Sequence, residues 1–207
     1  MSTRVKICGI TRPEDARCAV EAGADYLGLV LAENSARTVR AADVASWLED
    51  VRDPAEVVGV FRDQPLDVVL AAIDRLDLDF VQLHGRETGA EWTRLPVRMI
   101  EARVVDDRVP PARFAGAAWA HLLDGGAGSG RTFDWSLATE MARAERVFLA
   151  GGLDPENVTA AVRAVRPFAV DVASGTESAP GAKDPARVRA FVEAVRAADA
   201  DPRQESP

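Results

Sequence analysis

The chain has 207 residues, of which 47% are hydrophobic and 28% are charged. This composition is typical of a folded globular protein, and the length corresponds to one domain on the usual scale of roughly 150 residues. The chain carries 25 basic and 33 acidic residues, a formal net charge of −8. That sign argues against nucleic acid or an anionic membrane surface as the main partner.

The sequence also lacks the patterns of membrane insertion, export and metal binding. Its uncharged run from Phe114 to Leu123 is much shorter than the about 18 apolar residues that a membrane helix needs. Because no apolar signal region precedes the first strand-like run, we expect a cytoplasmic protein. Two cysteines and two histidines are too few for a disulfide framework or a histidine-rich metal site, so no metal is expected.

Short apolar, β-branched runs alternate with helix-like stretches along the whole chain. The predicted strands are 5–8, 26–31, 56–61, 80–83, 98–104, 118–124, 146–150 and 169–172. Eight strand-then-helix units predict a single-domain (β/α)8 TIM barrel, a fold that starts at about 200 residues. The alternative is an open doubly wound sheet, but no glycine-rich nucleotide turn follows the first strand. We assign residues 1–196 to the barrel and 197–207 to a polar C-terminal tail.

Three segments carry helix start signals. Thr11 and Glu14 have the spacing of a capping box, and Gly23 follows as a stop. Asp154 and Asp184 each precede a proline, which favours the first turn of a helix.

Barrel active sites lie at the carboxyl ends of the strands, where side chains alternate between the inside and the outside. Several polar residues near strand ends fall on one side of their strands. They are Lys6 and Cys8, Gln82 and His84, Asp124, and Asp171. We therefore expect all six side chains to converge at one mouth.

The two cysteines differ in position. Cys8 ends a strand beside Lys6, whose ammonium is expected to lower the thiol pKa from its usual value of about 8.5. Cys18 lies in the middle of a helix and is interpreted as a buried apolar residue. His121 is interpreted as a packed histidine between barrel and helices. Spacing alone leaves open whether Asp124 or Asp171 is an acid, because both end strands.

Glycines cluster after the last two strands. Gly151 and Gly152 follow the seventh strand, and Ser174 and Gly175 follow the eighth. Barrels frequently bind phosphate there through exposed backbone N–H groups. The alternative is that these glycines only permit tight turns. A third glycine-rich run, 125–130, follows Asp124 and is interpreted as a loop beside the same mouth.

Five motifs together resemble the phosphoribosylanthranilate isomerase family of tryptophan biosynthesis. They are Lys6-Ile7-Cys8-Gly9-Ile10-Thr11, Val81-Gln82-Leu83-His84-Gly85, Gly128-Ser129-Gly130-Arg131-Thr132-Phe133-Asp134-Trp135, Ala150-Gly151-Gly152-Leu153 with Pro155-Glu156-Asn157-Val158, and Asp171-Val172-Ala173-Ser174-Gly175. The resemblance implies a TIM barrel that performs an Amadori rearrangement of a small phosphorylated substrate without metal or organic cofactor. A monomer or homodimer is expected, with neither nucleic acid nor membrane as partner.

The resemblance also assigns residues to roles. The general base falls on Cys8, the general acid on Asp124, and the arginine for the substrate carboxylate on Arg37. The phosphate loops fall on the two glycine clusters, and Lys6, Gln82, His84 and Asp171 are expected to contact substrate. The chain departs from the family in its short glycine-rich segment 125–131 and in Ala32, near which the family usually has an aromatic residue.

Two other functions compete with this reading. One is the sister Amadori isomerase of histidine biosynthesis, which typically uses two strand-end aspartates, whereas Cys8 faces a single acid here. The other is a non-catalytic barrel that only binds a phosphate ligand, which the presence of both Cys8 and Asp124 disfavours.

Overall fold

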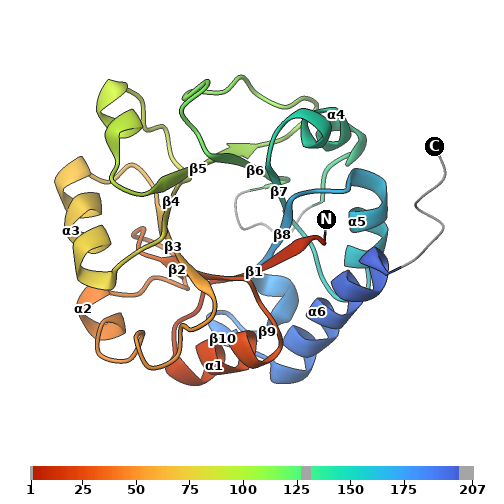
Figure 1. The fold of residues 1–207 in the computed structure, drawn as a ribbon, viewed down its shortest axis with the longest axis horizontal. Coiled ribbons are helices and arrows are strands. Elements are labelled where there is room, and N and C mark those ends of the chain that lie inside the picture. Colours follow the sequence, from red (N-terminus) through yellow and green to blue (C-terminus); the bar gives the residue numbers. More distant parts are fainter. Residues whose placement is uncertain (1, 127–131, 201–207) are drawn as a thin grey trace.

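The computed structural model describes residues 2–126 and 132–200. Eight parallel strands pair in sequence order and close into a barrel (Figure 1). The strands are β1 (Arg4–Cys8), β2 (Tyr26–Val30), β3 (Glu56–Phe61), β4 (Phe80–Leu83), β5 (Arg98–Val104), β6 (Ala120–Asp124), β7 (Val147–Ala150) and β8 (Ala169–Val172). The predicted TIM barrel is confirmed, and every predicted strand is found within two residues of its expected ends.

Side chains alternate along the strands as the sequence pattern predicts. Val5 and Ile7 face outward into the apolar layer under the helices, whereas Lys6 lies in the interior. Buried apolar side chains fill the amino-terminal half of the barrel, where the ring centroids of Tyr26 and Phe80 are 5.6 Å apart. This half is a packed core, so the polar interior residues are left to the carboxyl-terminal mouth.

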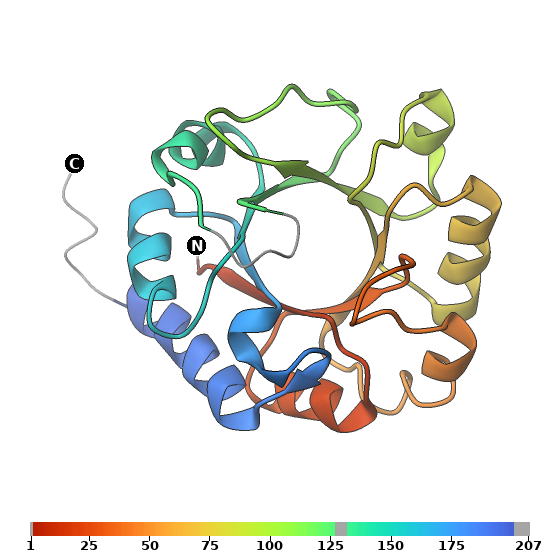
Figure 2. The same cartoon turned by 180° about the vertical axis from the view of Figure 1, so that it is seen from behind.

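Helices surround the barrel (Figures 1 and 2). They are α1 (Pro13–Glu21), α2 (Ala41–Val44), α3 (Leu66–Leu76), α4 (Ser136–Ala144), α5 (Val158–Val165), α6 (Pro185–Asp199) and the 3₁₀ turn η1 (Ala90–Arg94). The expectation of a helix after every strand is wrong at two places. Only η1 follows β4, and residues 105–119 after β5 contain no helix. Glycines and prolines, including Gly89 and the pair Pro110–Pro111, disfavour helices in both segments.

A polar network covers the barrel where the helix after β5 is missing. Glu101 and Arg103 of β5 and His121 of β6 are buried on the outer face of the sheet. Arg103 donates to His121 Nδ1 over 2.6 Å, and the backbone N–H of Arg113 donates to Glu101 over 2.6 Å. His121 also lies 2.7 Å from Glu145 after α4. His121 is therefore packed between barrel and surface, as expected, with polar partners.

The helix start signals have different outcomes. Asp184 caps α6 by accepting from two backbone N–H groups, as predicted. The capping box at Thr11 does not form, because the Thr11 hydroxyl instead donates to the carbonyl of Gly181. Asp154 accepts from the N–H groups of the next turn, and α5 begins only at Val158.

The loop between β8 and α6 contains a one-turn 3₁₀ helix, η2 (Ser174–Thr176), and a small hairpin of β9 (Glu177–Ala179) and β10 (Ala182–Lys183). The hairpin lies beside the start of α1 (Figure 1), since the Lys183 N–H donates to Asp15. Helix α6 runs to Asp199, so residues 197–199 are helical although we expected them in the tail. Residues 201–207 lie outside the described residues. Within the described part, no helix is both long and apolar enough to cross a membrane.

Candidate active site

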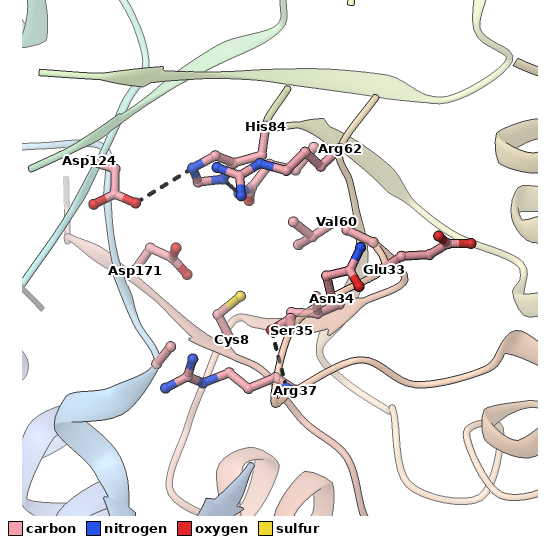
Figure 3. Close-up of a pocket in the computed structure, with 14 residues that line it drawn as sticks. Cys8, Glu33, Asn34, Ser35, Arg37, Val60, Arg62, His84, Asp124 and Asp171 are labelled. Atoms are coloured by element: carbon pink, nitrogen blue, oxygen red, sulfur yellow. Dashed lines mark hydrogen bonds and ion pairs between the residues drawn. The ribbon is translucent and has the colours of Figure 1, made fainter. Parts of the chain in front are cut away.

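A cavity opens at the carboxyl-terminal mouth of the barrel (Figure 3). The described residues that line it are Cys8, Val30, Ala32, Glu33, Asn34, Ser35, Arg37, Val60, Arg62, Gln82, His84, Asp124, Asp171 and Ala173. Six of the predicted site residues are in this set. Lys6 lies beneath the cavity with no exposed side-chain surface. The structure therefore brings together the polar strand ends that the sequence pattern singled out.

Lys6 and Asp171 form a buried ion pair below the cavity. The residues are register partners on the neighbouring strands β1 and β8, and Lys6 Nζ lies 2.8 Å from Asp171 Oδ1. Burial lowers the pKa of Lys6, but the charge of Asp171 and contacts with Cys8 outweigh it and raise the pKa overall. Lys6 is thus held as an ammonium, and it requires the negative charge of Asp171 beside it.

The Cys8 thiol lies in the cavity between Asp171 and Arg37 (Figure 3). Burial raises the pKa of Cys8, and the charge of Lys6 opposes this effect without overcoming it. The expected lowering of the pKa is therefore wrong, because Cys8 is only 8% exposed and the charge of Asp171 acts against that of Lys6. Gly28 on β2 is the register partner of Cys8 on β1. A side chain at position 28 would place its Cβ atom 2.8 Å from the Cys8 sulfur, so the glycine leaves room for the thiol.

His84 and Asp124 face each other across the mouth (Figure 3). His84 Nε2 lies 3.6 Å from Asp124 Oδ2, and the Gln82 amide nitrogen lies 3.1 Å from His84 Nδ1. Burial and the charge of Arg62 lower the pKa of His84 to about 4, so its ring is neutral near pH 7. The Gln82 amide thus contacts the Nδ1 side of the ring, and Nε2 faces Asp124.

Arg37 enters the cavity from the loop after β2. Its guanidinium makes a two-bond contact with Glu177 of β9, with Nε to Oε1 and Nη2 to Oε2 both at 2.7 Å. Lys183 of β10 lies 3.4 Å from the same carboxylate. Neither Glu177 nor Lys183 was singled out from the sequence. The sequence feature that could have pointed to them is that two residues of opposite charge, Glu177 and Lys183, follow the last glycine cluster within a short segment.

Arg62 also lines the cavity, and sequence reasoning missed it. It follows β3 directly, and its side chain reaches toward His84 (Figure 3). Among the described residues no carboxylate forms an ion pair with it, although its charge acts on His84. The signal in the sequence was a basic residue immediately after the apolar run 57–61.

The predicted phosphate residues lie outside the set that lines the cavity. The loops after β7 and β8 touch, because a Cβ atom on Gly175 would collide with the carbonyl oxygen of Leu153. Gly151 and Gly152 have positive φ values of 88° and 63°. The conformation of the backbone thus requires glycine at 151 and 152, and the close approach of the two loops requires glycine at 175. Ser174 is exposed beside them. Of the glycine-rich run 125–130, residues 127–130 lie outside the described residues.

No group of three or more His, Cys, Asp or Glu side chains among the described residues is arranged to hold a metal ion. From the described residues that line it, the cavity offers a thiol, carboxyl groups, a neutral imidazole and two guanidinium groups.

Comparison with known proteins agrees with this geometry. Residues 5–194 match the family described as N-(5'-phosphoribosyl)anthranilate (PRA) isomerase. The N-(5'-phosphoribosyl)anthranilate isomerase of Geotalea uraniireducens is 45% identical over 204 residues, which cover 94% of this chain and 98% of that protein.

Solved structures give the same result. A phosphoribosyl anthranilate isomerase from Thermus thermophilus superposes with a TM-score of 0.86 at 40% identity, covering 94% of this chain and 99% of its own. Another isomerase structure, in complex with reduced 1-(o-carboxyphenylamino)-1-deoxyribulose 5-phosphate, gives a TM-score of 0.81 at 35% identity, with coverage of 94% and 99%. The chain therefore belongs to the N-(5'-phosphoribosyl)anthranilate isomerase family.

Proposed function

We propose that this chain converts N-(5-phosphoribosyl)anthranilate to 1-(2-carboxyphenylamino)-1-deoxyribulose 5-phosphate by an Amadori rearrangement. The observation that carries the proposal is the placement of Cys8 and Asp124 on different strands, β1 and β6, facing the same cavity (Figure 3). The reaction needs an acid and a base on different sides of one sugar, and this arrangement supplies both.

Asp124 is the proposed general acid. It would protonate the ribose ring oxygen, so that the ring opens and a protonated Schiff base forms at C1′. Asp124 ends β6 at the mouth, with its Oδ2 3.6 Å from Nε2 of the neutral His84 ring. Asp171 is less suited to this role, because its Oδ1 is already engaged by the buried ammonium of Lys6, 2.8 Å away.

Cys8 is the proposed general base. Its thiolate would remove the C2′ proton of the Schiff base to give an enolamine, which tautomerises to the ketone. Lys6 below the sulfur stabilises the thiolate when it forms, while burial keeps the resting group protonated. A thiolate with a raised pKa is the stronger base, although only a small fraction is present near neutral pH.

The two ends of the substrate are proposed to bind at separate places. Arg37 would hold the anthranilate carboxylate, and Ser174 with the glycines at 151, 152 and 175 would hold the phosphate. The ligand in the related complex has a carboxyphenyl group at one end and a phosphate at the other. We propose that Gln82 and His84 contact the sugar between them, since both line the cavity.

The test is the loss of anthranilate fluorescence when purified protein acts on freshly prepared N-(5-phosphoribosyl)anthranilate. Cys8→Ala and Asp124→Asn should each lower kcat by about 10²- to 10⁴-fold, the usual contribution of a general acid or base. Cys18→Ala on α1 is the matched control and should retain activity. A folded parent protein that binds phosphate without consuming substrate would instead identify a binding module.

A further inference from the structure

Arg37 is held on one side by Glu177 of β9. Its Nε and Nη2 groups donate to the two oxygens of Glu177, both over 2.7 Å, in the planar fork that guanidinium and carboxylate prefer. The Glu177 side chain is 5% exposed and that of Arg37 is 17% exposed, so water competes little for either. An arginine side chain that is not held in this way loses more rotamer freedom on binding a ligand.

This contact leaves a defined part of Arg37 for a ligand. A guanidinium has five N–H donors, and Glu177 takes one from Nε and one from Nη2. One N–H of Nη1 and the second N–H of Nη2 form the end-on edge of the same plane, while the other N–H of Nη1 points back toward Cδ. The two N–H groups of that edge can donate to a second carboxylate in the same two-bond geometry.

Lys183 keeps the cluster positive. Arg37 and Glu177 alone would be neutral, but Lys183, whose side chain is fully buried, lies 3.4 Å from the same carboxylate. At formal charges the three groups sum to +1. Burial raises the pKa of Glu177, but the hydrogen bond from Arg37 and the charge of Lys183 outweigh it and lower the pKa overall. Glu177 is thus an anion that two cations share.

The hairpin that supplies these groups continues directly from the loop proposed to bind phosphate. Glu177 follows the turn Ser174–Thr176, and Lys183 Nζ donates to the carbonyl of Ala173 over 2.9 Å. The segment 173–183 therefore contains both the proposed phosphate loop and the two residues, Glu177 and Lys183, that hold Arg37 in place. A rigid segment of this kind fixes the separation between the two proposed anion sites.

We infer that Glu177 is a positioning residue, which with Lys183 aims the free edge of Arg37 at the substrate carboxylate and matches its distance to the phosphate loop. This inference rests on the proposed function. It explains why an acidic residue is buried beside an arginine that has to attract an anion. Glu177 aligns the guanidinium, and Lys183 offsets its charge.

Glu177→Gln keeps the shape of the side chain and removes its charge, so Arg37 is held by one hydrogen bond at most. KM should rise about 10-fold, equivalent to about 1.4 kcal/mol of binding, while kcat changes less than about 3-fold, because the contact is equal in ground and transition states. Glu177→Asp keeps the charge and should give a smaller rise in KM. Combined with Arg37→Lys, Glu177→Gln should add little further loss, because the two residues act as one unit.

Two measurements separate positioning from a structural role. Stabilisation of the protein by inorganic phosphate should be the same in Glu177→Gln and the parent. Asp43→Asn is the matched control, because Asp43 makes the same two-bond contact with Arg40 at the surface, and its KM should not change. Equal KM values in Glu177→Gln and the parent, or joint loss of phosphate stabilisation, would overturn the inference. Failure of the proposed function would show itself separately, as absence of turnover in the parent protein.

Discussion

Lys6 Nζ lies 2.8 Å from Asp171 Oδ1, and the Lys6 side chain is fully buried. The two residues are register partners, so this ion pair joins the first and last strands of the barrel directly. It also distinguishes the two aspartates that end strands at the mouth, because Asp171 pairs with a buried ammonium, whereas Asp124 lies 3.6 Å from His84 Nε2. The sequence spacing left both as candidates for the acid.

The first prediction follows from this asymmetry. Asp171→Asn leaves the Lys6 ammonium buried without its counter-charge, and removal of one partner of a buried pair typically costs about 3–5 kcal/mol. Urea unfolding at pH 7 should show this loss, and Asp124→Asn should lower kcat more than Asp171→Asn does. Lys6→Met combined with Asp171→Asn should restore much of the stability. The assignment fails if Asp124→Asn is the less damaging to kcat of the two single variants.

The second prediction concerns Cys8. Because burial raises its pKa, iodoacetamide should modify it with a rate that continues to increase above the usual thiol pKa of about 8.5. Loss of activity should follow this modification at every pH, and a phosphorylated product analogue should slow both. Peptide mapping separates Cys8 from Cys18. Full activity with Cys8 alkylated would exclude it as the base.

The third prediction concerns the charge next to His84. With a pKa of about 4, the imidazole should stay neutral down to about pH 5 in an NMR titration. Arg62→Gln removes a nearby positive charge that opposes protonation, so the pKa of His84 should increase toward its ordinary value. Arg75→Gln, on the exposed face of α3, should leave the titration unchanged. An unaltered His84 pKa in Arg62→Gln would show that Arg62 does not act on this site.

The fourth prediction concerns stability in acid. Burial raises the pKa of Glu101, but His121, the Arg113 N–H group and nearby guanidinium charges lower it to about 2. A depressed carboxyl pKa stabilises the fold above the ordinary value near 4.5, and this stabilisation is lost as the pH falls toward 2.

Glu101→Gln should therefore reduce the free energy of unfolding at pH 7 by up to about 3 kcal/mol. The difference from the parent should shrink steadily between pH 5 and pH 3, as followed by urea unfolding. Glu193→Gln, on the exposed face of α6, is the control. A difference that does not depend on pH would assign the loss to packing and not to charge.

The sequence by itself determined the barrel and the strand ends that form its mouth. Side chains alternate with a period of two within the short β-branched runs, and this pattern predicts which of them face inward. Cys8, Asp124 and Asp171 could therefore be placed at one mouth from the sequence alone. The same local signals placed the cap of α6 at Asp184. These features depend on residues close together in the chain, and local chemistry is sufficient for them.

Only the tertiary structure decided how those groups are charged and held. The partner of Lys6 is 165 residues away and that of Arg37 is 140 residues away, so spacing could not show that Asp171 or Glu177 would be there. The raised pKa of Cys8 depends on burial, which opposes the effect of its neighbour Lys6. Likewise, the network around Glu101 exists because prolines and glycines exclude a helix after β5. Burial and pairing across the barrel are properties of the closed fold, and no local pattern in the chain encodes them.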